Sequence, residues 1–236
     1  MAAKEIQKSV DVHGEPLYRA EASDLKVVLV RLFAMEQIES VIFDWGGVLI
    51  DDPRPALLRY CAAAFGMSVE DYAKIHDRFL DDFEKGLLSE EAFWENICRE
   101  LNRPKPKQDS LWADAFRSAY SPRADVFALA RKLHNEGYKT ALLSNTEAPA
   151  MRYFHQLNYG MFDQLIFSCA HGTLKPEKKI YEVTVRKLSS EPHHSVLIDD
   201  KLEYINGAKE VGLNAILFKS IDQVKDELAR LSVKTD

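Results

Sequence analysis

"ESVIFDWGGVLIDD", residues 39–52, joins a short apolar run to an aspartate and, after one tryptophan, to two glycines. The run at residues 40–44 is nearly all apolar, as expected of a strand buried on both faces of a sheet. Gly46 and Gly47 permit a tight turn and a close approach of the backbone to a ligand. Asp44 is therefore either a plain turn residue or a reactive carboxylate presented at a strand tip.

The composition is that of an ordinary globular protein, with 236 residues, 46% hydrophobic and 29% charged residues and a net charge of −6. This length suits one domain that carries a sizeable insertion. The negative charge, without a basic stripe, argues against nucleic acid as the main partner. The three cysteines are far apart and lack CxxC spacing, so they indicate neither a disulfide framework nor a zinc site and fit a reducing cytoplasm.

The N-terminal region is the least informative part of the chain. Its longest apolar run, residues 25–35, is interrupted by Lys26 and Arg31 and is too short to span a bilayer. It also lacks the pattern of a signal peptide. We expect residues 1–35 to form a poorly ordered extension, with the working domain starting near Met35, and we expect a cytoplasmic protein without membrane association. The sequence does not indicate an oligomeric state.

Short apolar runs alternate with helical patterns from residue 39 onward, which predicts an α/β fold with a Rossmann-like parallel sheet. The expected strands lie at residues 40–44, 139–145, 164–168, 195–200 and 214–218. The catalytic core would then comprise residues 36–52 and 122–236.

Residues 53–121 carry no alternating strand pattern and predict several helices. Ser68 and Ser89 stand at helix-start spacing, and Gly66 and Gly86 suit helix ends. We expect this segment to be a helical cap inserted into the core and placed over the carboxyl ends of the strands.

Three of the predicted strands end in polar residues: Asp44, Ser144 with Asn145, and Asp199 with Asp200. Ligands bind at the carboxyl ends of the strands in open parallel sheets, so these tips should converge on one crevice. The carboxylates would repel each other without a cation between them, and a set of oxygen ligands suits Mg²⁺.

Two further features indicate an anion site at the same crevice. Ser144 and Asn145 offer a hydroxyl, an amide and backbone N–H groups where we expect a helix to begin. Lys175 precedes Pro176, which suits the first position of the next helix, and its ammonium group could neutralise a phosphate oxygen. A carboxylate nucleophile, a metal, a polar cradle and a lysine together predict phosphoryl transfer through an aspartyl phosphate.

These motifs resemble those of the haloacid dehalogenase-like hydrolases, most of which are Mg²⁺-dependent phosphatases. "FDWGGVL", "LLSNT", "GTLKP" and "IDD" follow each other in the order of the family's four motifs, and the resemblance covers roughly residues 39–219. "FEKGLLSEEAFW" and "SCAHGTLKPEKKIY" look closest to a subgroup that includes bacterial sugar-phosphate phosphatases such as the α-glucose-1-phosphate phosphatase.

The resemblance implies a role for each motif residue. Asp44 is the nucleophile and a Mg²⁺ ligand, and the Gly46 carbonyl is a second ligand. Asp199 is the main acidic ligand, with Asp200 a ligand or its supporting partner. The phosphoryl group is held by Ser144, Asn145 and Lys175. The expected substrate is a small phosphorylated metabolite, such as a sugar phosphate.

Two departures from the family pattern leave alternatives open. Gly46 stands where most family phosphatases have a general acid and base, and Tyr204 stands where many have an asparagine. The missing acid favours activated phosphates, slow turnover, or a substitute such as Asp51, Asp52 or Glu84, although Glu84 also fits a solvated helix face. The alternatives are a 2-haloacid dehalogenase, or a weak family member with a binding or regulatory role.

Overall fold

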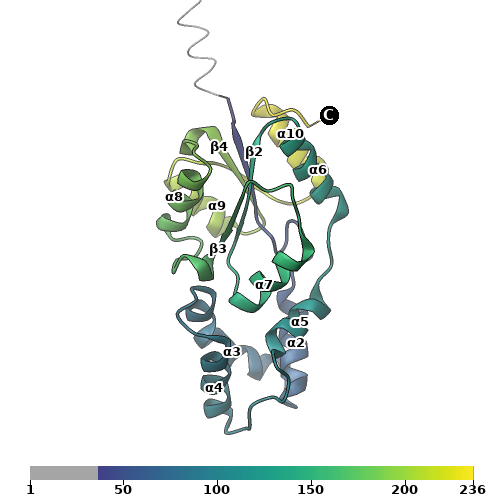
Figure 1. Cartoon of the computed structure of the whole chain (residues 1–236), viewed down its shortest axis with the longest axis vertical. Coiled ribbons are helices and arrows are strands. Elements are labelled where there is room, and N and C mark those ends of the chain that lie inside the picture. Colours follow the sequence, from purple (N-terminus) through teal and green to yellow (C-terminus); the bar gives the residue numbers. More distant parts are fainter. Residues whose placement is uncertain (1–36, 236) are drawn as a thin grey trace, which may run out of the picture. The chain divides into compact units, whose positions relative to one another are not determined.

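The computed structural model describes residues 37–235, so the extension expected at residues 1–35 lies outside the described part of the chain. A five-stranded parallel sheet forms the centre of this part, in the order β3-β2-β1-β4-β5 (Figure 1). The strands are β1 (Ser40–Phe43), β2 (Lys139–Ser144), β3 (Gln164–Phe167), β4 (Ser195–Asp199) and β5 (Asn214–Leu217). The predicted parallel α/β sheet is confirmed, although each strand ends one residue earlier than predicted because the chain turns out of the sheet at the tip residue.

Alternate residues along each strand face opposite sides of the sheet, and both sides are covered. Val41 and Phe43 belong to one hydrophobic cluster and Ile42 to the other. The first face is covered by α6 (Ala124–Asn135), α7 (Ala148–Leu157) and α10 (Ile221–Arg230), and the second by α8 (Lys178–Lys187) and α9 (Leu202–Glu210). Burial on both faces explains why the strands are nearly all apolar.

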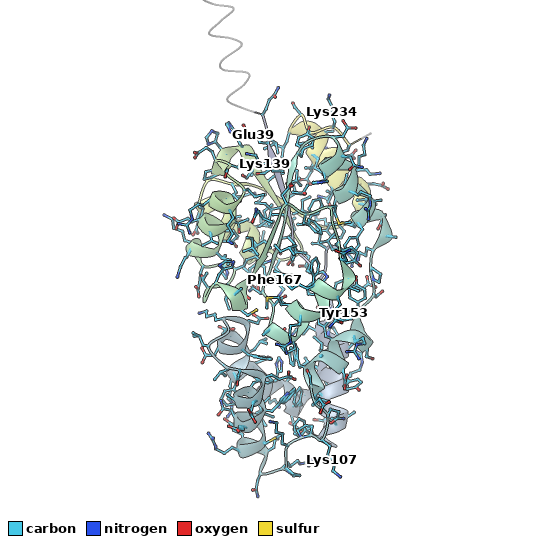
Figure 2. The ribbon with its side chains drawn as sticks, viewed as in Figure 1. Glu39, Lys107, Lys139, Tyr153, Phe167 and Lys234 are labelled. Atoms are coloured by element: carbon cyan, nitrogen blue, oxygen red, sulfur yellow. The ribbon has the colours of Figure 1, made fainter. Side chains whose placement is uncertain are left out.

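The carboxyl ends of the strands face the inserted helices. Glu39 directly precedes β1 and Lys139 opens β2, whereas Phe167 lies at the other end of the sheet, beside the insertion (Figure 2). The register pairs Phe43 with Leu142 on one side and with Ile198 on the other. Residues that follow these strands therefore meet at one edge of the sheet.

Four helices form the insertion between β1 and α6: α2 (Arg54–Ala64), α3 (Val69–Glu84), α4 (Glu90–Leu101) and α5 (Leu111–Ala119). The Ser68 and Ser89 hydroxyls accept hydrogen bonds from backbone N–H groups in the first turns of α3 and α4, as the sequence predicts. Stacked rings of Phe83 and Phe93, with centroids 4.4 Å apart, pack inside the insertion. We call these four helices the cap.

The two connections between cap and core are tied to each other. Ile50 pairs with Pro122 in an antiparallel bridge. The Asp51 carboxylate accepts hydrogen bonds from Ser121 Oγ at 2.7 Å and from Arg123 Nε at 2.9 Å. Asp51 therefore closes the base of the cap, and its side chain is engaged away from the crevice.

Two predicted helix starts are wrong by a few residues. Helix α7 begins at Ala148, so Ser144 ends β2 and Asn145 lies on the loop that precedes the helix. Helix α8 begins at Lys178, with Glu177 at the N-cap, so Pro176 precedes the helix instead of opening it. In both places an extended N-cap residue delays the first turn. Between residues 37 and 235, no helix is long and apolar enough to cross a bilayer.

Candidate active site

Lys175 lies between two carboxylates at the carboxyl edge of the sheet. Its Nζ is 2.8 Å from Asp44 Oδ1 and 2.6 Å from Asp199 Oδ2, and it donates to the Leu143 carbonyl at 3.2 Å. All three charged side chains are buried, with 7% or less of each exposed. Sequence reasoning predicted that these residues converge, and the structure brings them into direct contact.

The turn that follows Asp44 fixes the direction of its side chain. Asp44 N donates to the Ile198 carbonyl at 3.0 Å, and Leu49 N and Ile50 N both donate to the Trp45 carbonyl. Gly47 has φ +86°, and a Cβ there would lie 2.2 Å from Asp200 Oδ2. Only glycine fits both the left-handed backbone and the contact with Asp200.

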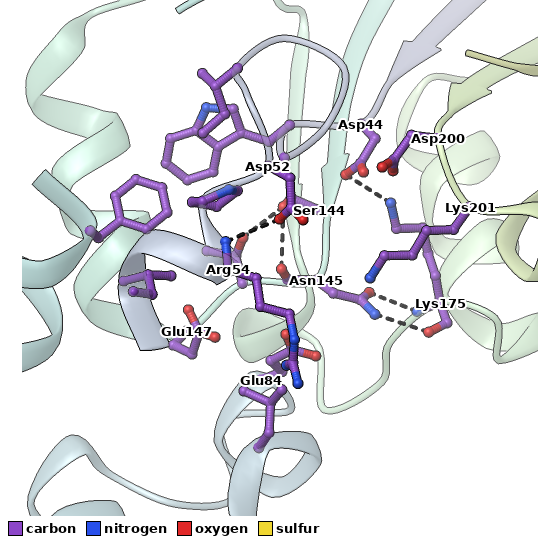
Figure 3. A pocket seen from close by; sticks show the side chains of 18 of the residues that line it. Asp44, Asp52, Arg54, Glu84, Ser144, Asn145, Glu147, Lys175, Asp200 and Lys201 are labelled. Atoms are coloured by element: carbon purple, nitrogen blue, oxygen red, sulfur yellow. Dashed lines mark hydrogen bonds and ion pairs between the residues drawn. The ribbon is translucent and has the colours of Figure 1, made fainter. Parts of the chain in front are cut away.

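The contacts of Asp199 and Asp200 differ from the expectation that Asp199 is the main acidic metal ligand. Both carboxylate oxygens of Asp199 are engaged, Oδ2 by Lys175 and Oδ1 by the backbone N–H of Lys201 at 2.9 Å. Asp200 Oδ1 is buried and, among residues 37–235, has no hydrogen-bond partner. Carboxylate oxygens of Asp44, Asp199 and Asp200 lie within 4.8 Å of one another, and Figure 3 shows Asp44 beside Asp200.

This cluster shifts the pKa values of its members. Burial, and then repulsion by Asp199, raises the pKa of Asp44 to about 7 although Lys175 opposes the shift. Burial and the Asp199 charge raise the pKa of Asp200. Burial lowers the pKa of Lys175, but the negative charges of Asp199 and Asp44 have the larger combined effect. They hold the pKa of Lys175 above its ordinary value. The excess negative charge favours binding of a cation.

The Asn145 amide holds the backbone of Lys175. Asn145 Oδ1 accepts from Lys175 N at 2.8 Å, and Nδ2 donates to the Lys175 carbonyl at 2.9 Å and to Tyr204 Oη at 3.2 Å (Figure 3). The side chain therefore positions the lysine, which differs from the expected contact with phosphate. Ser144 Oγ lies 2.6 Å from Thr146 Oγ1 and lines the same cavity as Lys175.

Tyr204 fills the position at which many family members have an asparagine. Its ring lies 4.9 Å from Lys175 Nζ and 4.9 Å from Lys201 Nζ, within the range of a cation–π contact. Its hydroxyl also accepts a hydrogen bond from Asn145. Tyr204 thus supports both lysines, a role that sequence reasoning did not find.

A cavity of about 230 Å³ connects these residues to the cap. Groups of the core and of the cap share its wall. The cap and the segment that leads into it contribute Asp52, Arg54, Leu57, Leu58, His76, Leu80, Asp81, Glu84, Trp112 and Phe116. The cavity therefore suits a small molecule that contacts the cap on one side and the strand tips on the other.

Glu147 is a buried acid of this cavity that sequence reasoning missed. It is 6% exposed, stands at the N-cap of α7, and accepts a hydrogen bond from Trp112 Nε1 at 2.9 Å. Burial, and then the charge of Glu84, raises the pKa of Glu147 to about 8. Its place in "SNTE", three residues after Ser144, was the available signal.

The three candidate substitutes for the missing acid have different environments. Asp51 is engaged at the base of the cap, so its candidacy is wrong. Asp52 lines the cavity but is exposed and accepts a hydrogen bond from Arg54 N at 3.0 Å. Glu84 lines the cavity and is partly buried, which corrects the solvated-face interpretation.

Comparison with known proteins supports the resemblance to the haloacid dehalogenase-like hydrolases. The chain is 25% identical to a sesquiterpene phosphatase from Aspergillus oryzae over 182 residues, which covers 74% of this chain and 87% of that protein. A haloacid dehalogenase-like family hydrolase from Porphyromonas gingivalis has a similar structure, with a TM-score of 0.69 at 24% identity, covering 84% of this chain and 99% of that one.

A haloacid dehalogenase-family enzyme from Bacteroides thetaiotaomicron, solved in complex with magnesium and inorganic phosphate, has a TM-score of 0.64 at 23% identity. The similarity covers 78% of this chain and 96% of that one, and it bears on the fold. The family model described as haloacid dehalogenase-like hydrolase matches residues 38–212. That match spans the strand tips and the cap together, and the chain belongs to this hydrolase family.

Proposed function

We propose that the protein is a Mg²⁺-dependent phosphatase that acts on a small phosphorylated metabolite through an aspartyl phosphate on Asp44. The buried, unpartnered Oδ1 of Asp200 carries this proposal. A buried carboxylate oxygen without a partner is costly, and a cation at this point would satisfy it. The phosphatase relative from Aspergillus oryzae also supports the proposal.

The residues present fit a magnesium ion. Asp44, the Gly46 carbonyl and Asp200 would supply oxygen ligands, and water and substrate would complete the shell. Asp199 supports the site by holding Lys175 and the Lys201 backbone, which reverses the order of the two acids implied by the resemblance. When bound, Mg²⁺ supplies positive charge that offsets the carboxylates and the phosphate oxygens.

The chain's own groups then account for the reaction. An Asp44 carboxylate oxygen attacks phosphorus, and the bond between phosphorus and the leaving oxygen breaks with its electron pair on that oxygen, which takes up a proton. Lys175 offsets charge on the phosphoryl oxygens, and Ser144 lies where its hydroxyl can donate to one of them. Water then attacks the aspartyl phosphate, loses a proton, and releases inorganic phosphate with Asp44 restored.

The 2-haloacid dehalogenase alternative fits the charges less well. Asp200 adds a second acid beside Asp44 whose Oδ1 is free of hydrogen bonds within the described part of the chain. Without a metal, this carboxylate would repel the carboxylate of a haloacid. The carboxylate of Asp44, the lysine and the neighbouring acids form one connected set. A protein with only a binding or regulatory role would not need such a set, so the site does not favour that alternative.

A panel assay separates these functions. We expect phosphate release from at least one of a set of sugar, triose, acyl and nucleotide phosphates, only with Mg²⁺, and its loss in Asp44→Asn. Glu39→Gln, at an exposed position just before β1 and at the far end of the sheet from the cavity, is the control and should keep full activity. Chloride release from 2-chloropropionate without metal would select the dehalogenase, and silence of the folded wild-type protein on all substrates would refute both enzymes.

A further inference from the structure

The core residues leave the leaving-group oxygen without a proton donor, because Gly46 has no side chain. Gly46 is also closely covered, since a Cβ there would lie 3.1 Å from Pro53 Cδ. A side chain at this position would be in tight contact with the proline ring, which would have to shift slightly. The donor must therefore come from another part of the cavity wall.

Glu84 is held at the cavity by its own backbone. It is the last residue of α3, and its carbonyl accepts a hydrogen bond from Ser168 Oγ at 2.6 Å. The same Ser168 Oγ accepts from Thr146 N at 2.8 Å, and Ser168 is fully buried. One hydroxyl thus joins the end of the cap helix to the loop that follows Ser144.

The two residues after Glu84 strengthen this connection. Lys85 Nζ is 2.6 Å from Glu177 Oε1, and Glu177 also accepts from Thr173 Oγ1 at 2.7 Å. Gly86 has φ +71°, and a Cβ there would lie 2.3 Å from the Cys169 carbonyl oxygen. Such a close approach of two backbones leaves little freedom for Glu84 to move relative to the core.

The positions of Asp44 and Glu84 on the wall of one cavity are compatible with an in-line displacement. Both residues line one cavity, and Figure 3 shows Asp44 and Glu84 at opposite ends of the view, with Asn145 between them. In phosphoryl transfer, the attacking and leaving oxygens lie on opposite sides of phosphorus. A phosphoryl group attacked by Asp44 would direct its leaving oxygen toward the cap.

We propose that Glu84 of the cap is the catalytic acid and base that protonates the leaving oxygen, in place of the side chain missing at Gly46. The proposal rests on the phosphatase function above. In the first step the Glu84 carboxyl gives its proton to the leaving oxygen as the bond to phosphorus breaks, which produces the free alcohol. In the second step the Glu84 carboxylate takes a proton from the water that attacks the aspartyl phosphate.

The charges around Glu84 are compatible with both steps. Burial is the largest influence and raises the pKa of Glu84 to about 7. The groups that face it across the cavity and along its helix are Lys201, Asp81, Lys175, Arg54 and Glu147. The cations lower this pKa and the acids raise it, so both protonation states are populated near neutral pH.

Other acids of the cavity are less suitable. Glu147 already accepts a hydrogen bond from Trp112 Nε1, and Asp52 accepts one from Arg54 N. Asp81 lines the cavity but is exposed. Glu84 combines partial burial with a backbone that the core holds in place.

The test compares Glu84→Gln with the wild type on the best alkyl phosphate of the panel and on 4-nitrophenyl phosphate, whose leaving group needs no proton. We expect Glu84→Gln to lower the first-step rate on the alkyl phosphate by about 10²- to 10⁴-fold. The burst of 4-nitrophenol should keep its rate, and the following steady state should slow because the base is missing.

Two variants serve as references. Asp82→Asn removes an exposed charge from the same helix, away from the cavity, and should behave as the wild type. Glu84→Asp keeps a carboxyl and should recover part of the alkyl rate, together with the fall of that rate above about pH 7, which Glu84→Gln should lack.

The outcomes separate this proposal from the one on which it rests. If Asp44→Asn is inactive but Glu84→Gln cleaves alkyl and aryl phosphates in the wild-type ratio, the phosphatase stands and Glu84 is not its acid. Equal losses on both substrates would also overturn the role of Glu84, since they indicate a general defect. A folded wild-type protein that releases no phosphate would overturn both proposals.

Discussion

Replacing Glu147 by glutamine should stabilise the protein at neutral pH, although the side chain makes a hydrogen bond in the folded state. Glu147 is 6% exposed and accepts from Trp112 Nε1 at 2.9 Å. A glutamine has nearly the same shape, and its amide oxygen can accept the same bond. The substitution therefore removes the titration of a buried carboxyl and little else.

The size of the effect follows from the pKa of Glu147, which burial and then Glu84 raise from 4.5 to about 8. Between these values the folded state binds more protons than the unfolded chain, so stability is complete below pH 4.5 and is lost as the pH rises toward 8. At about 1.4 kcal/mol for each pH unit, the loss by pH 7 is about 3 kcal/mol. Because Glu84 titrates in the same cavity, the measured slope includes both groups.

Urea denaturation between pH 5 and pH 8, in the presence of a chelator, measures the difference directly. We expect Glu147→Gln to exceed the wild type by less than about 1 kcal/mol at pH 5 and by about 3 kcal/mol at pH 7. Glu95→Gln, at an exposed position of the cap, should show no such trend. A difference that is independent of pH, or a variant less stable than the wild type at pH 7, would refute the reasoning.

Two more substitutions test the carboxylate cluster. Lys175→Met leaves Asp44 and Asp199 without their shared cation, so the free energy of unfolding without Mg²⁺ should fall by about 3 to 5 kcal/mol in urea titrations. Unchanged stability would contradict the central place of this lysine. Gly47→Ala places a Cβ against Asp200 in a left-handed backbone, so calorimetric titration should show Mg²⁺ affinity at least about tenfold weaker. Wild-type affinity would show that Asp200 does not contribute to the metal site.

The fold and the meeting of the strand-tip residues could be predicted because they depend on short-range patterns. A buried parallel strand reads as an apolar run, and its polar end marks the edge of the sheet at which ligands bind. Asp44, Lys175 and Asp199 follow this rule and meet within hydrogen-bond distance. Capping serines such as Ser68 are also local signals, which is why the cap helices began where expected.

The contacts that each side chain makes inside the site could not be predicted, because they join segments that are distant in the chain. The amide of Asn145 meets the backbone of Lys175, thirty residues away in the chain. Asp199 and Asp200 are adjacent acids, and only the positions of Lys175 and Gly47 show which of them is already engaged. Sequence order indicates which residues share a crevice, but it does not indicate which atoms are left without partners.

In the proposed reaction, the relation between Gly46 and the cap accounts for an acid that comes from the cap. Gly46 does not have a left-handed φ, so its backbone would accept another residue, but Pro53 lies 3.1 Å from the position of its Cβ. Pro53 opens the cap, and the same cap carries Glu84 back to the cavity through the contact of its carbonyl with Ser168. Because the Ser168 contact and the close approach of Gly86 to Cys169 hold this end of the cap against the core, an acid at Glu84 would keep its position in the cavity without a separate closing step.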